Sequence, residues 1–304
     1  MKQESGFYKF WRIVYPILIY FIIQFLVVFG FITITFALTT ANAGEHPSLM
    51  KVMQEAMNEV IRQQFLMTVI SAAVGLPIFG ALYAADVKKR RSEGRLDTVK
   101  AVPAVKYVLP VILGLAACIL GNNLITFSGL FQIDEAFEEV AQVLYQGNLI
   151  VEFLCIGVLV PIVEELLFRG LVYRRMRDHV RPLIAGILSA LLFGIVHGNL
   201  VQGVYAFLLG ALMAYVFERF QSILAPILIH VAANLFSVAA SELPAFEPLM
   251  TEGTAAFWIV TAVCAAAVIG TMYLVEKTVD GGTPQQPRAE VPPVQPPVPP
   301  LNTV

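Results

Sequence analysis

The chain is dominated by apolar stretches that are long enough to cross a membrane. Of its 304 residues, 58% are hydrophobic and 14% are charged, and the mean hydropathy is +0.74. Soluble globular domains carry about 25% charged residues, so this composition indicates an integral membrane protein. Because one crossing takes about 20 apolar residues, the sequence predicts an all-α, polytopic membrane protein with about eight transmembrane helices. We expect them near residues 14–38, 65–85, 107–130, 149–173, 183–197, 200–217, 222–240 and 256–275.

The distribution of basic residues supports this count and predicts an orientation. Eight crossings place the N-terminus, three loops and the C-terminus on one side, and these segments hold 17 of the 20 Lys and Arg residues. Adding or removing one helix would disturb the partition. Because cytoplasmic segments are enriched in Lys and Arg, we expect both termini to be cytoplasmic, which in a bacterium means the plasma membrane. The three loops are 86–106, 174–182 and 218–221.

Composition also bounds the partners and the domain organisation. A net charge of −2 gives no electrostatic footprint for nucleic acid, so we expect membrane lipid and no nucleic acid as a partner. The tail from residue 280 is rich in Gly, Gln and Pro and cannot form a packed core. The predicted division is 1–148 with the first three helices, a core at 149–240 with the next four, the last helix at 241–279, and a disordered cytoplasmic tail at 280–304.

A few ionisable and amide side chains lie inside the apolar stretches. A charge at the bilayer centre costs about 2.5–3.5 kcal/mol on insertion scales, so such residues are candidates for a functional site. All of them belong to types that act in catalysis, and they occupy three successive parts of the predicted core. They are Glu164, Glu165, Arg169, His197, His230 and Asn234.

The spacing of these residues groups them on helix faces. Glu165 and Arg169 are four residues apart and share a face, so Arg169 can neutralise Glu165. This leaves Glu164 without a partner on its own helix and suited to take a proton from water. His230 and Asn234 are also four residues apart, so their N–H groups could converge on a developing oxyanion.

Phe193 and His197 have the same four-residue spacing, just before the turn at Gly198. The stretch 183–197 rises only about 21 Å, short of the roughly 30 Å hydrocarbon thickness. The turn should therefore lie below the membrane surface, where irregular backbone lines a protein-enclosed or water-filled cavity. Water in a cavity beside Glu164 is what a hydrolysis reaction requires.

Together, the three motifs carry a family resemblance. Glu-Glu-x-x-x-Arg at 164–169, Phe-x-x-x-His at 193–197 and His-x-x-x-Asn at 230–234 resemble, in this order, the motifs of the CAAX protease and bacteriocin-processing family of intramembrane endopeptidases. This family includes the type II CAAX prenyl endopeptidases. The resemblance covers about residues 149–240.

The resemblance implies a role for each motif residue. Glu164 activates water with the aid of His197, and His230 and Asn234 hold the oxyanion. Glu165 belongs to the catalytic set, and Arg169 and Phe193 orient the site.

The need for a metal ion stays open at this point. Glu164, His197 and His230 could supply the three-ligand set of a catalytic zinc. However, the sequence has no His-Glu-x-x-His pattern, and each of these histidines is alone on its helix. We therefore favour a mechanism without a metal, with zinc as the alternative.

The leading hypothesis is an intramembrane protease that cleaves a hydrophobic or membrane-associated peptide or protein. Prenylated C-termini, precursor peptides and lipid-anchored proteins all fit this description. A second hypothesis is a non-catalytic membrane scaffold or bacteriocin-immunity protein that keeps the motifs as structural polar pairs. A transporter is disfavoured because paired helices interrupted by Gly or Pro are not evident in the sequence.

Overall fold

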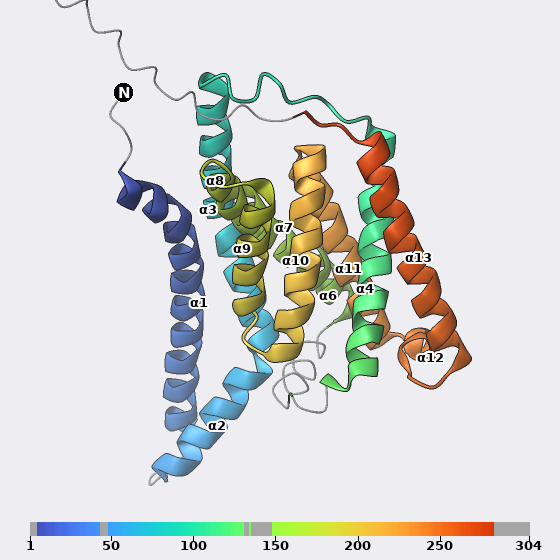
Figure 1. Ribbon diagram of the computed structural model, residues 1–304. Coiled ribbons are helices and arrows are strands. Elements are labelled where there is room, and N and C mark those ends of the chain that lie inside the picture. The colour runs from blue at the N-terminus through green and yellow to red at the C-terminus, as the bar shows by residue number, and fades with distance from the viewer. Residues whose placement is uncertain (1–4, 43–47, 131–133, 135–147, 283–304) are drawn as a thin grey trace, which may run out of the picture.

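The computed structural model describes residues 5–42, 48–130, 134 and 148–282, and within these ranges the chain is helical and has no strand (Figure 1). Six helices are long and apolar enough to cross a membrane, with α4 counted together with the turn Ala104–Tyr107 that precedes it. The predicted class of an all-α, polytopic membrane protein is confirmed. The six are α1 (Gly6–Asn42), α3 (Gln64–Ser92), α4 (Val108–Ser128), α10 (Leu200–Phe220), α11 (Leu224–Glu242) and α13 (Ala255–Thr278).

The other two predicted crossings are helical but differ from ordinary spans. The stretch 149–177 is one continuous helical segment in which α6 (Leu149–Leu154), α7 (Val160–Glu165) and α8 (Arg174–Arg177) are joined by π-helical stretches. α9 (Pro182–Ile195) has only 14 residues. All eight predicted ranges are therefore helical, but the exact count of eight crossings is not confirmed. The π-helical stretches are Cys155–Leu159 and Leu166–Tyr173.

One helix lies in the stretch between the first two predicted crossings, for which the sequence predicts a connecting segment. α2 (Leu49–Arg62) slants between the ends of α1 and α3 (Figure 1). It buries Val52, Ala56 and Val60, which recur at four-residue spacing and therefore form one face. It has only 14 residues, and six of them are Lys, Arg, Glu, Gln or Asn, so it is too short and too polar to be recognised as a crossing. Further along, the turn Pro244–Phe246 and α12 (Glu247–Met250) connect α11 to α13.

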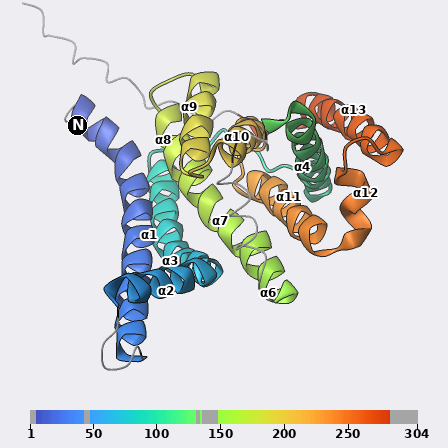
Figure 2. The same cartoon turned by 90° about the horizontal axis from the view of Figure 1, so that it is seen from below.

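The later part of the segment 149–177 is enclosed by the other helices. In Figure 2, α7 runs between α1 and α3 on one side and α10 and α11 on the other. Every residue from 166 to 175 is buried, and Leu167, Phe168 and Leu171 have no exposed surface. The Glu-Glu-x-x-x-Arg motif at 164–169 therefore faces protein rather than lipid. Charged side chains within a membrane normally face protein in this way.

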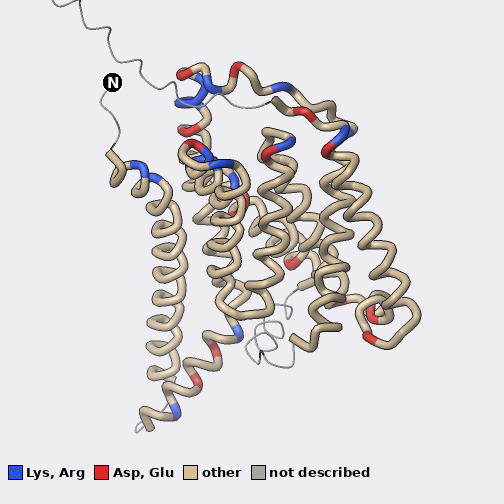
Figure 3. The backbone as a smooth tube through the Cα atoms, viewed as in Figure 1, with Lys and Arg blue, Asp and Glu red and all other residues tan. Residues whose placement is uncertain are grey.

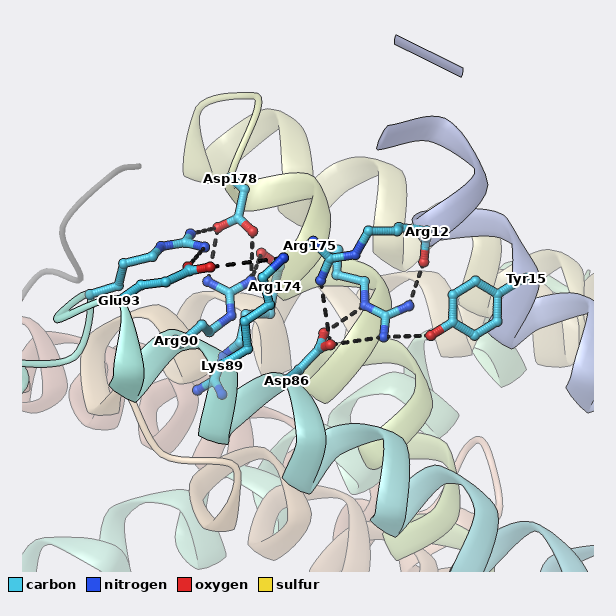
Figure 4. A network of polar contacts seen from close by, with 10 residues as sticks. Arg12, Tyr15, Asp86, Lys89, Arg90, Glu93, Arg174, Arg175 and Asp178 are labelled. Carbon is cyan, nitrogen blue, oxygen red and sulfur yellow. Dashed lines mark hydrogen bonds and ion pairs between the residues drawn. The ribbon is translucent and has the colours of Figure 1, made fainter. Parts of the chain in front are cut away.

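Lys and Arg gather at one end of the bundle, which we call the basic end (Figure 3). A polar network ties the helices together there (Figure 4). Pro16 has no N–H, so the carbonyl of Arg12 lacks its helical donor, and Nη1 of Arg175 donates to that oxygen instead. Nε of Arg175 also donates to Asp86 at 2.6 Å, which links α1, α3 and α8. Which side of the membrane holds this end stays a prediction.

The division into segments 1–148, 149–240 and 241–279 also stays a prediction. The predicted disordered tail, 280–304, falls outside the described residues except for residues 280–282.

Gly114 on α4 permits a close approach of α11. A Cβ at this position would lie 2.3 Å from the carbonyl oxygen of Ile229, the residue before His230. Gly114→Ala should therefore force the two helices apart and lower the free energy of unfolding by about 1–3 kcal/mol, measured by denaturation in detergent. Gly80→Ala is the control, because a Cβ there meets nothing within 4 Å. Equal effects of the two substitutions would contradict this account.

Candidate active site

Glu165 is bound by side chains from two helices at the centre of the bundle. Its Oε1 accepts a hydrogen bond from Nη1 of Arg169 at 2.7 Å and lies 2.9 Å from Nδ1 of His230. Glu165 and Arg169 have no exposed surface, and His230 is 4% exposed. Because an ionised carboxylate only accepts hydrogen bonds, Nδ1 of His230 carries a proton and donates it. The predicted ion pair is present, and His230 from α11 completes it.

Glu164 stands in a different environment from its neighbour. Its Oε2 lies 3.6 Å from Nε2 of His230, and its side chain is 12% exposed, whereas that of Glu165 is fully buried. Within the described part of the chain, neither carboxylate oxygen of Glu164 takes part in a hydrogen bond. A separation of 3.6 Å is too long for a direct hydrogen bond and suits a bridging water. His230 therefore lies between the two adjacent glutamates, bonded to one and close to the other.

Glu164 lines a cavity that also involves helices outside the predicted core. The cavity measures about 50 Å³, and one water needs about 10–15 Å³ on this measure, so several waters fit. Gln24 and Tyr20 of α1 line it and are joined by a 3.1 Å hydrogen bond. Ser71 of α3 also lines it, and its buried Oγ has no hydrogen-bond partner among the residues that the structure describes. The remaining lining residues are Ile23, Thr68, Ala72, Phe79, Val160 and Val163.

These residues of α1 and α3 were not predicted from the sequence. The signal that could have found them is the presence of polar side chains, Gln24 and Ser71, inside otherwise apolar helices. Nothing in the spacing of Gln24 or Ser71 connects either residue to Glu164, so only the packing of the helices reveals the shared cavity.

Phe193 connects the remaining histidine to this cluster. Its ring centre lies 4.8 Å from that of His197 and 5.6 Å from that of His230, with edge-to-face geometry in both pairs. The guanidinium carbon of Arg169 lies 4.5 Å from the same ring centre. Nδ1 of His197 is 2.7 Å from the carbonyl oxygen of Phe193, to which it donates, and this leaves Nε2 as an acceptor. His197 therefore contacts Phe193, and the same ring contacts His230 and Arg169.

Asn234 makes a contact that its sequence position did not predict. Its Nδ2 donates to the carbonyl oxygen of Ile156 at 3.0 Å. The N–H of Val160 bonds to Cys155 in the π-helical turn, and Pro161 has no N–H. Ile156 therefore lacks a donor within its own helix, and Asn234 supplies one. A side-chain amide has two N–H bonds, so the second one is left for another partner.

The zinc alternative that the sequence left open concerns Glu164, His197 and His230. Among the described residues, no group of three or more His, Cys, Asp or Glu side chains is arranged to hold a metal ion. His230 approaches Glu164, whereas His197 packs on Phe193 and donates Nδ1–H to the backbone. Such a backbone bond is also common in histidines that bind zinc through Nε2, so the metal-free mechanism stays a prediction.

Comparison with known proteins identifies the segment that carries the cluster. Residues 146–236 match the family described as type II CAAX prenyl endopeptidase Rce1-like. This segment is therefore similar to that family. The resemblance predicted from the three motifs is thereby confirmed, and every motif residue lies in the Rce1-like segment, whereas the α1 and α3 walls of the cavity lie outside it.

A curated protein of Bacillus subtilis (strain 168), named "Putative membrane peptidase YdiL", is 30% identical over 94 residues. The match covers 31% of this chain and 38% of that relative. No solved structure matches the chain.

Proposed function

We propose that the protein is an intramembrane endopeptidase in which Glu164 activates water to cleave a hydrophobic or membrane-associated peptide or protein. The observation that carries this proposal is the contrast between the two adjacent glutamates. Glu165 is fully buried and bonded to Arg169 and His230, while Glu164 lines the cavity and accepts no hydrogen bond from the described residues. The Rce1-like segment and the name of the Bacillus relative support a membrane peptidase.

In the proposed reaction, Glu164 takes a proton from water while the water oxygen bonds to the peptide carbonyl carbon. Nε2 of His197 is an acceptor that orients this water. The developing oxyanion is held by the second N–H of Asn234 and by Nε2–H of His230. For His230 to donate from both nitrogens in this step, its ring carries both protons.

The second step returns the proton. Glu164 passes it to the leaving nitrogen as the C–N bond breaks, which restores the carboxylate and releases an amine and a carboxylic acid. Glu165 and Arg169 act by positioning His230, because Glu165 holds Nδ1 and Arg169 holds Glu165. Phe193 contacts both imidazoles and Arg169 and fixes their relative placement.

The test is a cleavage assay with purified protein in liposomes, followed by mass spectrometry. Three peptide classes are supplied: farnesylated C-terminal peptides, hydrophobic precursor peptides and lipidated peptides. Wild type should cleave at least one class, Glu164→Gln should not, and a chelator such as EDTA should leave the rate unchanged. No cleavage in any class would contradict the peptidase proposal, and loss of cleavage with chelator would contradict the metal-free mechanism.

A second candidate function is a non-catalytic scaffold or immunity protein. The observation that favours it is that Glu165, Arg169 and Asn234 all make contacts that stabilise the bundle. In that case Glu164→Gln should retain full cellular function in a complementation assay, whereas the peptidase proposal expects loss of that function.

A further inference from the structure

A second recess lies at the basic end of the bundle, where α8 meets the ends of α3 and α10. We propose that this recess binds a phosphate group, with the guanidinium of Arg174 as its central ligand. The phosphate belongs to an anionic phospholipid headgroup or to free phosphate. The lining residues are Arg90, Arg95, Leu96, Tyr173, Arg174, Arg177, Asp178, Phe217, Glu218 and Gln221.

Positive charge is in excess in this recess, because four arginines and two carboxylates line it. Asp178 accepts hydrogen bonds from Nη1 and Nη2 of Arg90 at 2.8 and 2.7 Å, and it also binds Arg95. Figure 4 shows the pairing of Asp178 with Arg90. Arg95 pairs with Glu93 as well, at 3.5 Å. Arg174 and Arg177 are therefore the arginines that these two carboxylates do not balance.

The second carboxylate is also occupied. Glu218 accepts a hydrogen bond from the hydroxyl of Tyr173 at 2.8 Å and another from Nε of Arg177 at 3.1 Å. Neither carboxylate that lines the recess is thus left over for Arg174.

Arg174 is the cation that this arrangement leaves unpaired. It is 9% exposed, and within the described residues its guanidinium makes no hydrogen bond or ion pair. The guanidinium carbon lies 5.0 Å from the ring centre of Phe217 and 5.4 Å from that of Tyr83. Contact with the two rings stabilises the cation but leaves its N–H donors unused.

An unused guanidinium that is this deeply buried points to an oxyanion ligand. Burying an unpaired charge is unfavourable, and a guanidinium offers a planar fork of donors that matches phosphate oxygens. Nearby, Nε of Arg95 is buried and has no hydrogen-bond partner within the described part of the chain, so a further donor is left unused in the same recess. Nη2 of Arg90 donates to the backbone carbonyl of Arg174 at 3.0 Å and so fixes the position of Arg174.

The location of the recess favours a lipid phosphate over a soluble one. It lies where the long apolar helices end among Lys and Arg residues, and phospholipid phosphates occupy that level of a membrane. Exposed basic residues would attract anionic lipids without a defined site. A nearly buried arginine instead predicts that one substitution removes most of the binding.

The test compares two substitutions that remove one positive charge from the same end. Arg174→Gln alters the recess, and Arg181→Gln alters an exposed residue at the start of α9. The melting temperature of purified protein is measured in detergent with added phosphatidylglycerol, phosphatidylcholine or inorganic phosphate. Phosphatidylglycerol should raise the melting temperature of wild type and of Arg181→Gln by several degrees. Arg174→Gln should bind it at least about tenfold more weakly, as expected for loss of a charge-assisted pair of hydrogen bonds.

The results of this experiment distinguish a lipid phosphate from a soluble phosphate, and some of them would overturn the proposal. A shift with inorganic phosphate equal to that with phosphatidylglycerol would assign the site to soluble phosphate. Equal responses of Arg174→Gln and Arg181→Gln, or no response of wild type to either phosphate source, would overturn the proposal. If Arg174→Gln does not fold, Arg174→Lys keeps the charge without the planar fork, and an unchanged affinity in that variant also overturns it.

Discussion

Glu164→Gln is expected to lower kcat for peptide cleavage by about a thousand-fold or more, because a general base contributes about 10²–10⁴ to the rate. Glutamine has nearly the same size and keeps an oxygen in the cavity, but it cannot take a proton from water. Since Glu164 makes no hydrogen bond with the described residues, the substitution removes none from the fold. The melting temperature should therefore stay close to that of wild type, and KM should change little.

The matched control is Glu152→Gln. Glu152 is a fully buried glutamate on α6, at the other end of the same helical segment. It tests whether loss of a buried carboxylate on this segment impairs the enzyme by itself. We expect its kcat to stay within a few fold of wild type. Comparable losses in the two variants, or a Glu164→Gln enzyme with undiminished kcat, would remove Glu164 as the base.

Helices were predicted correctly where the length and hydropathy of an apolar run are enough to identify a membrane crossing. A run of about 20 apolar residues satisfies its backbone hydrogen bonds only as a helix in lipid, so α1, α3, α4, α10, α11 and α13 followed directly. α2 was missed because it has only 14 residues and six of them carry charged or amide side chains. The π-helical turn at Cys155–Leu159 was also missed, although Pro161 marks the place where helical donors are lost.

Within the site, local pairs were predictable and contacts between helices were not. Arg169 is one turn from Glu165, so helical geometry alone brings them together, and the structure has this bond. The position of His230 between the two glutamates depends on the packing of α11 against α7. The contact of Asn234 with Ile156 and the presence of Ser71 in the cavity depend on packing in the same way. Sequence spacing carries no information about these distances.

Arg169→Met is expected to lower the free energy of unfolding by roughly 3–5 kcal/mol, because it leaves Glu165 as a buried charge without its cation. Both side chains have no exposed surface, so water cannot replace the lost partner. Methionine fills most of the space without introducing a new charge. Equilibrium unfolding in detergent measures the change.

Two further variants show whether the loss comes from the uncompensated charge. Adding Glu165→Gln to Arg169→Met removes that charge, so the double variant should recover much of the stability. Lys51→Met breaks another i,i+4 ion pair, with Glu55, whose side chains are 78% and 52% exposed. It should change stability by less than about 1 kcal/mol. Equal effects of Arg169→Met and Lys51→Met would show that the central pair is not essential to the bundle.

The same double variant separates stability from positioning. Its Glu165→Gln change replaces the carboxylate that holds Nδ1 of His230, so the imidazole no longer has an anion on that side. If His230 donates to the oxyanion, kcat should stay low even where stability has recovered, since the amide does not position Nδ1 as the carboxylate does. Recovery of kcat together with stability would instead assign Glu165 and Arg169 a purely structural role.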